Sequence, residues 1–140
     1  MRTVRDVMSG DIEVLGITET AADAAGFLAT HSEDDVPLCL ADGSLAGMVS
    51  NHDIVAKVVA KGLDPRVVTL AELAEPTEPS EVLSLDADLS VEDAVAVMCR
   101  HHRARLPVTE HDRVIGLVTQ RDVARSLQFV PSWVDAFGDA

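Results

Sequence analysis

Aromatic and basic residues are scarce in this chain of 140 residues. It holds one Trp, three Phe and no Tyr, and its 11 Lys and Arg face 24 Asp and Glu, a net charge of 11 − 24 = −13. A chain with this charge repels nucleic acid at long range, and it has no basic stripe with interleaved aromatic residues. We therefore expect no nucleic-acid partner, and any anionic ligand must depend on a local cluster of cations.

Cysteines and long apolar runs are scarce as well. Cys39 and Cys99 fit neither a metal-site spacing nor a disulfide framework. We expect two reduced and mostly buried thiols. The apolar runs are far shorter than the roughly 20 residues of a membrane span, and the start "MRTVRDVMSGD" lacks the apolar stretch of a secretory signal. The sequence therefore predicts a cytoplasmic protein without a membrane partner.

An internal duplication is the strongest feature that is present. "TETAADAAGFL" (18–28) matches "DLSVEDAVAVM" (88–98) at a shift of 70 residues, and "VPLCL" matches "LPVTE" at the same shift. One residue is lost in the next turn, where a duplicated unit tolerates a change of length. After that turn the shift is 69, and the matched pairs are Gly47 with Gly116, Ser50 with Thr119 and Asp53 with Asp122. Agreement in this register is too extensive for chance.

Both copies predict the same order of elements: strand, helix, strand, strand, helix. Thr20 and Ser90 are followed three residues later by Asp23 and Asp93, the pattern of a helix capping box. We predict an α+β fold of two pseudo-symmetric repeats packed sheet against sheet, because about 60 residues bury too little surface alone. The predicted ranges are 1–61 and 69–127 for the repeats, 62–68 for the linker and 128–140 for a tail.

The repeated motif is glycine, two apolar residues, Ser or Thr, two variable residues and Asp. It places a hydroxyl at the end of a strand and a carboxylate in the first turn of the next helix, where the helix dipole favours negative charge. A carboxylate that accepts from two vicinal hydroxyls is a common way to hold a ribose, and backbone N–H groups at a helix start suit a phosphate. Alternatively, Ser50 and Thr119 only cap their helices. Two copies in register favour the ligand.

The stretches "VPLCLADGSLAGMVSNHDIV" and "RLPVTEHDRVIGLVTQRDVA" resemble a pair of CBS domains, the tandem often called a Bateman module. The resemblance covers residues 4 to 127, and the length and "GLDPRVVTLAELA" resemble small stand-alone pairs of the hypoxic-response type. It implies a dimer and clefts for an adenosine-containing ligand (AMP, ADP, ATP or S-adenosylmethionine). By motif match, Asp122 and Asp53 would accept from ribose hydroxyls, with Thr119 and Ser50 beside them. An arginine two residues before the strand proline, here Arg105, would reach the phosphate.

The first repeat departs from that pattern, because Asp35 stands where the second repeat has Arg105. It reads "HSEDDVP" where the second reads "HHRARLP", and His52 replaces Arg121. Acidic side chains near a phosphate oppose its binding. We predict a nucleotide-competent second-repeat site, with Thr119, Asp122, Arg121, Arg105 and Arg103, and a weaker first-repeat site, with Ser50 and Asp53. The alternative for the arginines is a solvated helix end.

Other signals are weaker. His31 and His101 align at predicted helix ends, and His101 and His102 point about 100° apart on a helix, which disfavours a shared metal ion. No catalytic motif is visible, so we predict a non-enzymatic, homodimeric sensor that acts on an effector protein. The alternative is a ligand-free, stress-related dimeric interaction protein. Phe129, Trp133 and Phe137 predict an apolar tail that packs on its own module or on a partner.

Overall fold

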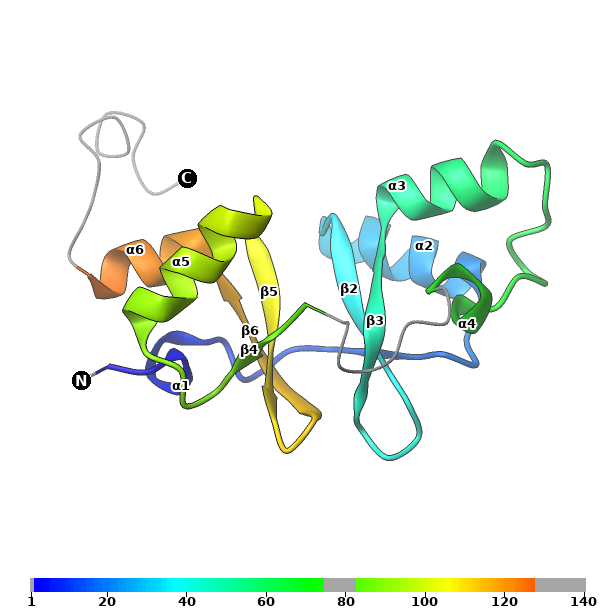
Figure 1. The fold of residues 1–140 in the computed structure, drawn as a ribbon. Helices are drawn as coiled ribbons and strands as arrows, with labels where there is room; N and C mark the ends of the chain where they lie inside the picture. The colour runs from blue at the N-terminus through cyan, green and yellow to red at the C-terminus, as the bar shows by residue number, and fades with distance from the viewer. Residues whose placement is uncertain (1, 75–82, 128–140) are drawn as a thin grey trace. The chain divides into compact units, whose positions relative to one another are not determined.

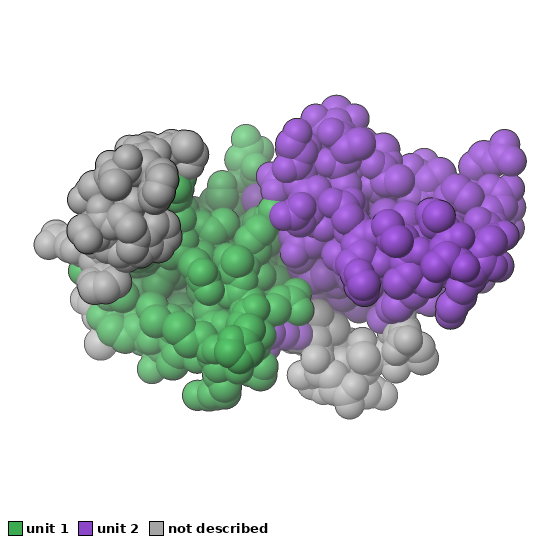
Figure 2. Space-filling view, turned by 90° about the horizontal axis from the view of Figure 1, so that it is seen from above, with its two compact units in different colours: residues 1–11, 84–110, 115–140 green, residues 12–83, 111–114 purple. Residues whose placement is uncertain are grey.

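The computed structural model describes residues 2–74 and 83–127. The predicted aromatic tail, with Phe129, Trp133 and Phe137, lies outside the described residues. The chain folds into two compact units that alternate along the sequence. The first-repeat unit comprises residues 12–83 and 111–114, and the second-repeat unit comprises 1–11, 84–110 and 115–140 (Figure 2). Within the described residues, no helix has the length and apolarity needed to cross a membrane.

The first-repeat unit has the predicted order of elements (Figure 1). They are β1 (Leu15–Gly16), α2 (Ala21–His31), β2 (Asp35–Cys39), β3 (Leu45–Ser50), α3 (Asn51–Ile54), a π-helical turn η1 (Val55–Val59) and α4 (Leu70–Leu73). β1 pairs in parallel with β2, and β2 pairs antiparallel with β3. The strand pairing sets Asp35 opposite Ser50 and Pro37 opposite Met48. β2, which carries Pro37, therefore lies directly beside β3, which ends at the motif hydroxyl of Ser50.

The second-repeat unit repeats this order. Its elements are α1 (Val4–Val7), β4 (Leu85–Asp86), α5 (Val91–His101), β5 (Arg105–Glu110), β6 (Arg113–Thr119) and α6 (Gln120–Ser126), although the first two residues of β6 are grouped with the first-repeat unit. The sheet order is β4-β5-β6, and β4 pairs in parallel with β5. The predicted α+β fold with two β-α-β-β-α repeats is confirmed. Each sheet has three strands, and its apolar face must be buried against another layer.

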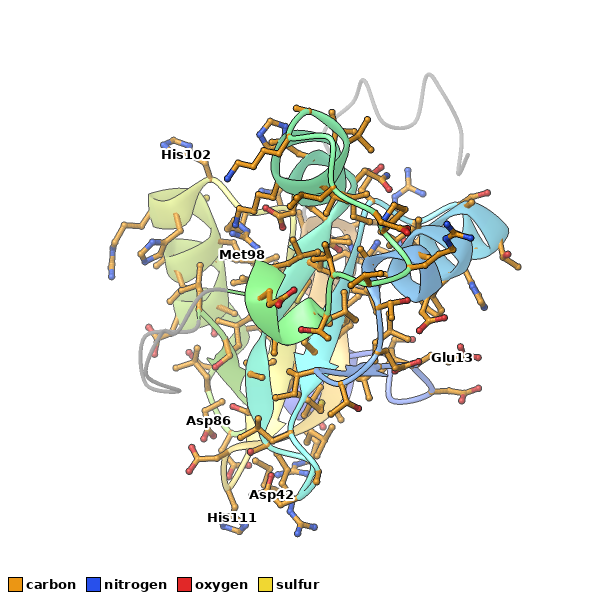
Figure 3. The ribbon with its side chains drawn as sticks, turned by 90° about the vertical axis from the view of Figure 1, so that its right-hand side faces the viewer. Glu13, Asp42, Asp86, Met98, His102 and His111 are labelled. Atoms are coloured by element: carbon orange, nitrogen blue, oxygen red, sulfur yellow. The ribbon has the colours of Figure 1, made fainter. Side chains whose placement is uncertain are left out.

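Apolar stripes on the first helix of each repeat form that layer. Leu28 of α2 is 2% exposed and packs in a core with Leu38, Val49 and Leu70. The matching position in α5 is Met98, which is 1% exposed (Figure 3). Ala24 and Ala94, one turn earlier, are also fully buried. These apolar stripes are the buried faces of the two helices, and they hold each helix against its own sheet.

The short helices α1 and α4 lie in the matching segments "VRDVM" and "LAELA". α1 packs in the second-repeat unit, where Val4 N–H donates to the Leu89 carbonyl at 2.8 Å and Ser9 pairs with Leu117. The guanidinium of Arg5 bonds the carboxylates of Asp88 and Glu110. The start of the chain therefore belongs to the unit built around the second repeat.

Candidate functional site

Each predicted motif forms a complete capping box at the start of a helix. In the first repeat, Ser50 Oγ accepts the Asp53 N–H at 3.1 Å, and the Ser50 N–H donates to Asp53 Oδ2 at 2.9 Å. In the second, Thr119 Oγ1 accepts the Asp122 N–H at 3.1 Å, and the Thr119 N–H donates to Asp122 Oδ2 at 3.0 Å. Both aspartates are part-buried third residues of their helices. The capping role that the sequence left open is real in both copies.

The capped helix start is tied to the loop before the proline strand, in the same way in both repeats. Asn51 donates its N–H to the Asp34 carbonyl at 2.9 Å, and its side-chain amide to the Glu33 carbonyl at 3.4 Å. In the second repeat Gln120 donates to the Ala104 carbonyl at 2.9 Å and, from its side chain, to the Arg103 carbonyl at 3.2 Å. The hydroxyl–aspartate motif is thereby held next to residues 33–35 in one copy and 103–105 in the other.

Those loop residues carry opposite charges. Glu33, Asp34 and Asp35 adjoin the Ser50 motif, whereas Arg103 and Arg105 adjoin the Thr119 motif. Arg121 is exposed as the second residue of α6. The backbone of Arg103 and of Ala104 is thus hydrogen-bonded to the helix start of the second-repeat motif, and Arg121 follows in the same helix start. The sequence next to the motif is therefore basic in the second repeat and acidic in the first.

Sequence reasoning missed Lys57, which lies in η1 four residues after Asp53. Its Nζ lies 3.7 Å from Asp53 Oδ1 and donates to the Leu73 carbonyl at 3.1 Å. The signal in the sequence was an acid followed at i+4 by a lysine, a spacing that places both side chains on one face of a helix. The matching residue in the second repeat, at the shift of 69, is Ser126.

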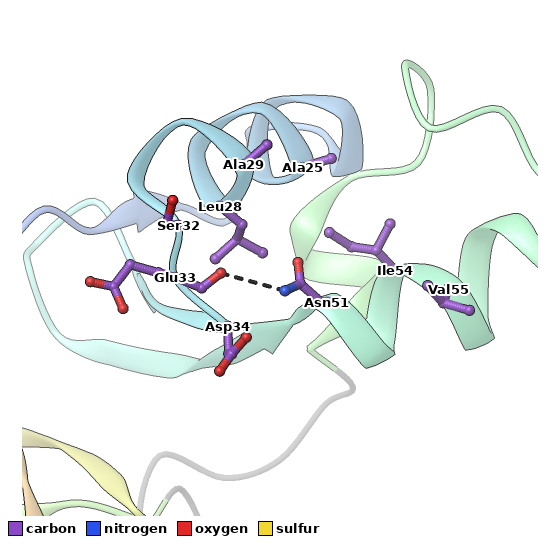
Figure 4. A pocket seen from close by; sticks show the side chains of 9 residues that line it. All are labelled: Ala25, Leu28, Ala29, Ser32, Glu33, Asp34, Asn51, Ile54 and Val55. Atoms are coloured by element: carbon purple, nitrogen blue, oxygen red, sulfur yellow. Dashed lines mark hydrogen bonds between the residues drawn. The ribbon is translucent and has the colours of Figure 1, made fainter. Parts of the chain in front are cut away.

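A pocket of about 480 Å³ in the first-repeat unit was also not predicted (Figure 4). It is lined by Ala25, Leu28, Ala29, Ser32, Glu33, Asp34, Asn51, Ile54 and Val55. Its wall on α2 contains Ala25 and Ala29, where α5 carries the larger Val95 and Cys99. Ser50 and Asp53 are not among the lining residues, so this pocket lies beside the motif and does not contain it.

The two cysteines and the histidines at the helix ends lie outside the hydroxyl–aspartate motifs. Cys39 is buried, and desolvation raises the pKa of its thiol. The expectation that both thiols are mostly buried is wrong for Cys99, which is exposed because it follows Met98 and leaves the apolar face of α5. His31 and His101 end α2 and α5 as predicted. His102, in the left-handed conformation, projects from the end of α5 (Figure 3).

We find no candidate metal site in the part of the chain that the structure describes. There, no three His, Cys, Asp or Glu side chains gather in a group able to hold a metal ion. His31 bonds the Phe27 carbonyl through Nδ1 at 2.9 Å and stacks on the Phe27 ring, with 4.2 Å between centroids. Its Nε2 lies 3.8 Å from one carboxylate oxygen of Glu13. These contacts fix the imidazole at the helix end.

Two β-α-β-β-α repeats, each with a hydroxyl–aspartate box after its last strand, define a tandem-repeat class of α+β fold. The CBS domain model matches residues 4–60 and 76–128, and the chain belongs to the CBS-domain family. It is 37% identical over 127 residues to Hypoxic response protein 1 of Mycobacterium tuberculosis, covering 91% of this chain and 86% of that protein.

Solved structures agree with this assignment. The crystal structure of Hypoxic Response Protein I, described with two coordinated zinc ions, has a TM-score of 0.79 at 36% identity and covers 90% of this chain and 99% of that one. The CBS domain pair of protein MJ0100, solved with 5′-methylthioadenosine and S-adenosyl-L-methionine, has a TM-score of 0.70 at 25% identity and covers 91% of this chain and 97% of that one. Both similarities extend over the two repeats.

Proposed function

We propose that this protein is a non-catalytic regulatory module that binds an adenosine-containing ligand through the second-repeat motif. The ligand class is AMP, ADP, ATP or S-adenosylmethionine, in the cleft that the family resemblance implies between repeats. Asp122 would accept from the ribose hydroxyls, with Thr119 beside it. Arg103, Arg105 and Arg121 would supply positive charge for a phosphate.

The observation that carries the proposal is the position of the two arginines beside the Thr119 box. The Gln120 side chain fixes the Arg103 backbone at 3.2 Å, so a basic loop and a part-buried carboxylate are held together. A ribose phosphate needs this pair of opposite charges: an acceptor for its hydroxyls and cations for its phosphate. The adenosyl ligands of the MJ0100 domain pair support the ligand class. In a net anionic chain, local cations of this kind are what an anionic ligand requires.

The regulatory part of the proposal follows from thermodynamic linkage. A ligand that contacts one arrangement of the repeats better than another shifts the population toward that arrangement. We propose that the protein acts as a homodimer on an effector protein in the cytoplasm, and that the change of arrangement alters its contact with that effector.

Thermal unfolding with a panel of nucleotides tests the proposal. A ligand that binds only the folded chain stabilises it by RT ln(1 + [L]/Kd), about 2.7 kcal/mol at one hundred times Kd. We expect an increase in melting temperature with an adenosine nucleotide, which Asp122→Ala abolishes and Asp53→Ala largely preserves. Asp122→Asn is the matched variant, because an amide oxygen still accepts the Thr119 N–H while the negative charge is lost. An unchanged wild-type melting temperature at millimolar concentration would contradict the proposal.

A second candidate function is supported by the completeness of the capping boxes. Each hydroxyl and each aspartate already has a backbone partner, which is sufficient reason for the motif without a ligand. In that case the protein is a dimeric, stress-related interaction module. Both aspartate variants would then cost only about 1 kcal/mol of stability, the scale of a lost helix cap, and nucleotides would have no effect.

A further inference from the structure

Lys57 gives the first repeat a cation for which the second repeat has no counterpart at the same position. Its ammonium lies between two acceptors, Asp53 Oδ1 at 3.7 Å and the Leu73 carbonyl oxygen at 3.1 Å. The Lys57 side chain is 35% exposed and that of Asp53 is 27% exposed. The pair is therefore partly withdrawn from solvent, where an ion pair is screened less than on the open surface.

The local backbone differs between the repeats at this position. In the first repeat the helix passes from α3 into the π-helical turn η1, in which the Ala60 N–H donates to the Val55 carbonyl at 2.8 Å. In the second repeat α6 runs without such a turn from Gln120 to Ser126. Turns of this wider kind occur frequently at functional sites. Ser126, at the position of Lys57, is too short to reach a carboxylate one turn away.

Both oxygens of the Asp53 carboxylate are engaged within the chain. Oδ2 accepts the Ser50 N–H at 2.9 Å, and Oδ1 faces Lys57 Nζ. A carboxylate holds a ribose by accepting from two vicinal hydroxyls, and its negative charge strengthens those bonds. The Lys57 ammonium, 3.7 Å from Oδ1, is beyond hydrogen-bond distance, but its positive charge offsets the charge of the carboxylate.

We propose that Lys57 competes with ribose for the Asp53 carboxylate and thereby weakens ribose binding at the first-repeat motif. The inference rests on the proposed function, because it takes the Asp53 motif to be a ribose site by descent. Under this proposal the two motifs differ in ribose binding for two reasons: the Lys57 cation and the acidic loop at 33–35. The Lys57 side chain leaves the capping box intact, and it makes the Asp53 carboxylate a poorer acceptor for the hydroxyls of a ligand.

The alternative role for Lys57 is to bind the phosphate of a nucleotide in the first repeat. The surroundings oppose that role, because Glu33, Asp34 and Asp35 adjoin the same motif and repel a phosphate. The Lys57 ammonium also already has the Leu73 carbonyl as a hydrogen-bond acceptor. The two roles predict opposite results. A competing Lys57 weakens the binding of an uncharged nucleoside, whereas a phosphate-binding Lys57 strengthens the binding of a nucleotide.

Calorimetric titration with adenosine, which has no phosphate, tests the inference in an Asp122→Asn background that disables the second-repeat motif. We expect Lys57→Met with Asp122→Asn to bind adenosine at least about threefold more tightly than Asp122→Asn alone, the scale of one lost ion pair. Lys57→Arg in the same background keeps the charge and should show no gain. Adding Asp53→Asn should remove the gain, and melting temperatures without ligand identify any variant that fails to fold.

A reciprocal variant keeps the inference testable if Lys57→Met unfolds the chain. Ser126→Lys places an ammonium four residues after Asp122, and it should weaken adenosine binding by an otherwise wild-type chain. Equal adenosine affinity with and without Lys57, or weaker AMP binding after Lys57→Met, would overturn the inference. The wild-type chain tests the proposed function separately: its response to AMP with no gain from Lys57→Met overturns the inference alone, and no response in any variant overturns both.

Discussion

The two capping motifs have the same backbone geometry and different chemical surroundings. The hydrogen bonds of the Ser50–Asp53 box and of the Thr119–Asp122 box agree within 0.1 Å, from 2.9 and 3.1 Å in one to 3.0 and 3.1 Å in the other. The loops beside them are acidic in the first repeat and basic in the second, and a lysine faces the aspartate only in the first.

This difference separates what folding requires from what a ligand requires. A capping box satisfies the N–H groups that a helix start leaves without partners, so both repeats retain it whether or not they bind anything. The charged residues around the box are not needed for helix formation, because the helix forms with acidic residues nearby in one repeat and basic residues nearby in the other. The comparison therefore assigns the shared residues to the fold and the divergent residues to selectivity.

The largest expected effect on stability concerns the motif glycines, which are needed for different reasons. A Cβ at Gly116 would lie 2.6 Å from Met8 Sδ and 2.8 Å from the Ser9 carbonyl oxygen, whereas a Cβ at Gly47 would lie 3.5 Å from that of Ala74. Gly47 is instead needed for its φ of 157°. We expect Gly116→Ala to lower the free energy of unfolding by about 1–3 kcal/mol, the usual cost of overpacking, measured by urea denaturation.

A double-mutant cycle with Met8→Ala sharpens this prediction. Removing the Met8 thioether should recover part of the loss from Gly116→Ala, by about 0.5 kcal/mol or more for residues in direct contact. The Ser9 carbonyl remains, so recovery should be incomplete. Strict additivity of the two substitutions would show that the close approach of Met8 is not what requires glycine at position 116.

The next effect compares the matched helices α2 and α5. A Cβ added at Gly26, inside α2, would meet nothing within 4 Å beyond the backbone of its own helix, and the matching residue of α5 is Ala96. Glycine inside a helix costs roughly 0.5–1 kcal/mol relative to alanine. We expect Gly26→Ala to raise the free energy of unfolding by about that amount and Ala96→Gly to lower it similarly. Chemical denaturation measures both, and a destabilising Gly26→Ala would contradict the comparison.

Much of the fold followed from the sequence, because it is set by local patterns that occur twice. Two such features depend only on residues within one or two turns: the caps at Thr20 and Ser90, and the helix ends at His31 and His101. The family resemblance, which the comparisons confirm, rests on the same repeated patterns.

The contacts that the sequence did not reveal join distant segments or depend on shape. Lys57 contacts Leu73 across 16 residues, and α1 joins the unit of a repeat that begins far along the chain. The pocket beside the first motif depends on the alanines of α2 meeting α3, which composition does not specify. The ligand roles of Asp53 and Asp122 remain predictions, because a capping box and a ribose site use the same two side chains.

The smallest effect is a pH dependence of the cap of α2. The Thr20 N–H donates to Asp23 Oδ2 at 2.9 Å, and Thr20 Oγ1 accepts the Asp23 N–H at 3.2 Å. The bond that the Thr20 backbone N–H donates to the Asp23 carboxylate, and then one from the Thr20 hydroxyl, lower the pKa of the Asp23 carboxyl below its usual 3.8. Because the folded-state pKa is the lower one, the stabilisation is complete above about pH 4 and is lost as pH falls through the folded-state pKa. Carbon-13 NMR titration of the Asp23 carboxyl should give a midpoint below that of the urea-unfolded chain, and coinciding midpoints would show that the Thr20 cap does not favour the ionised form.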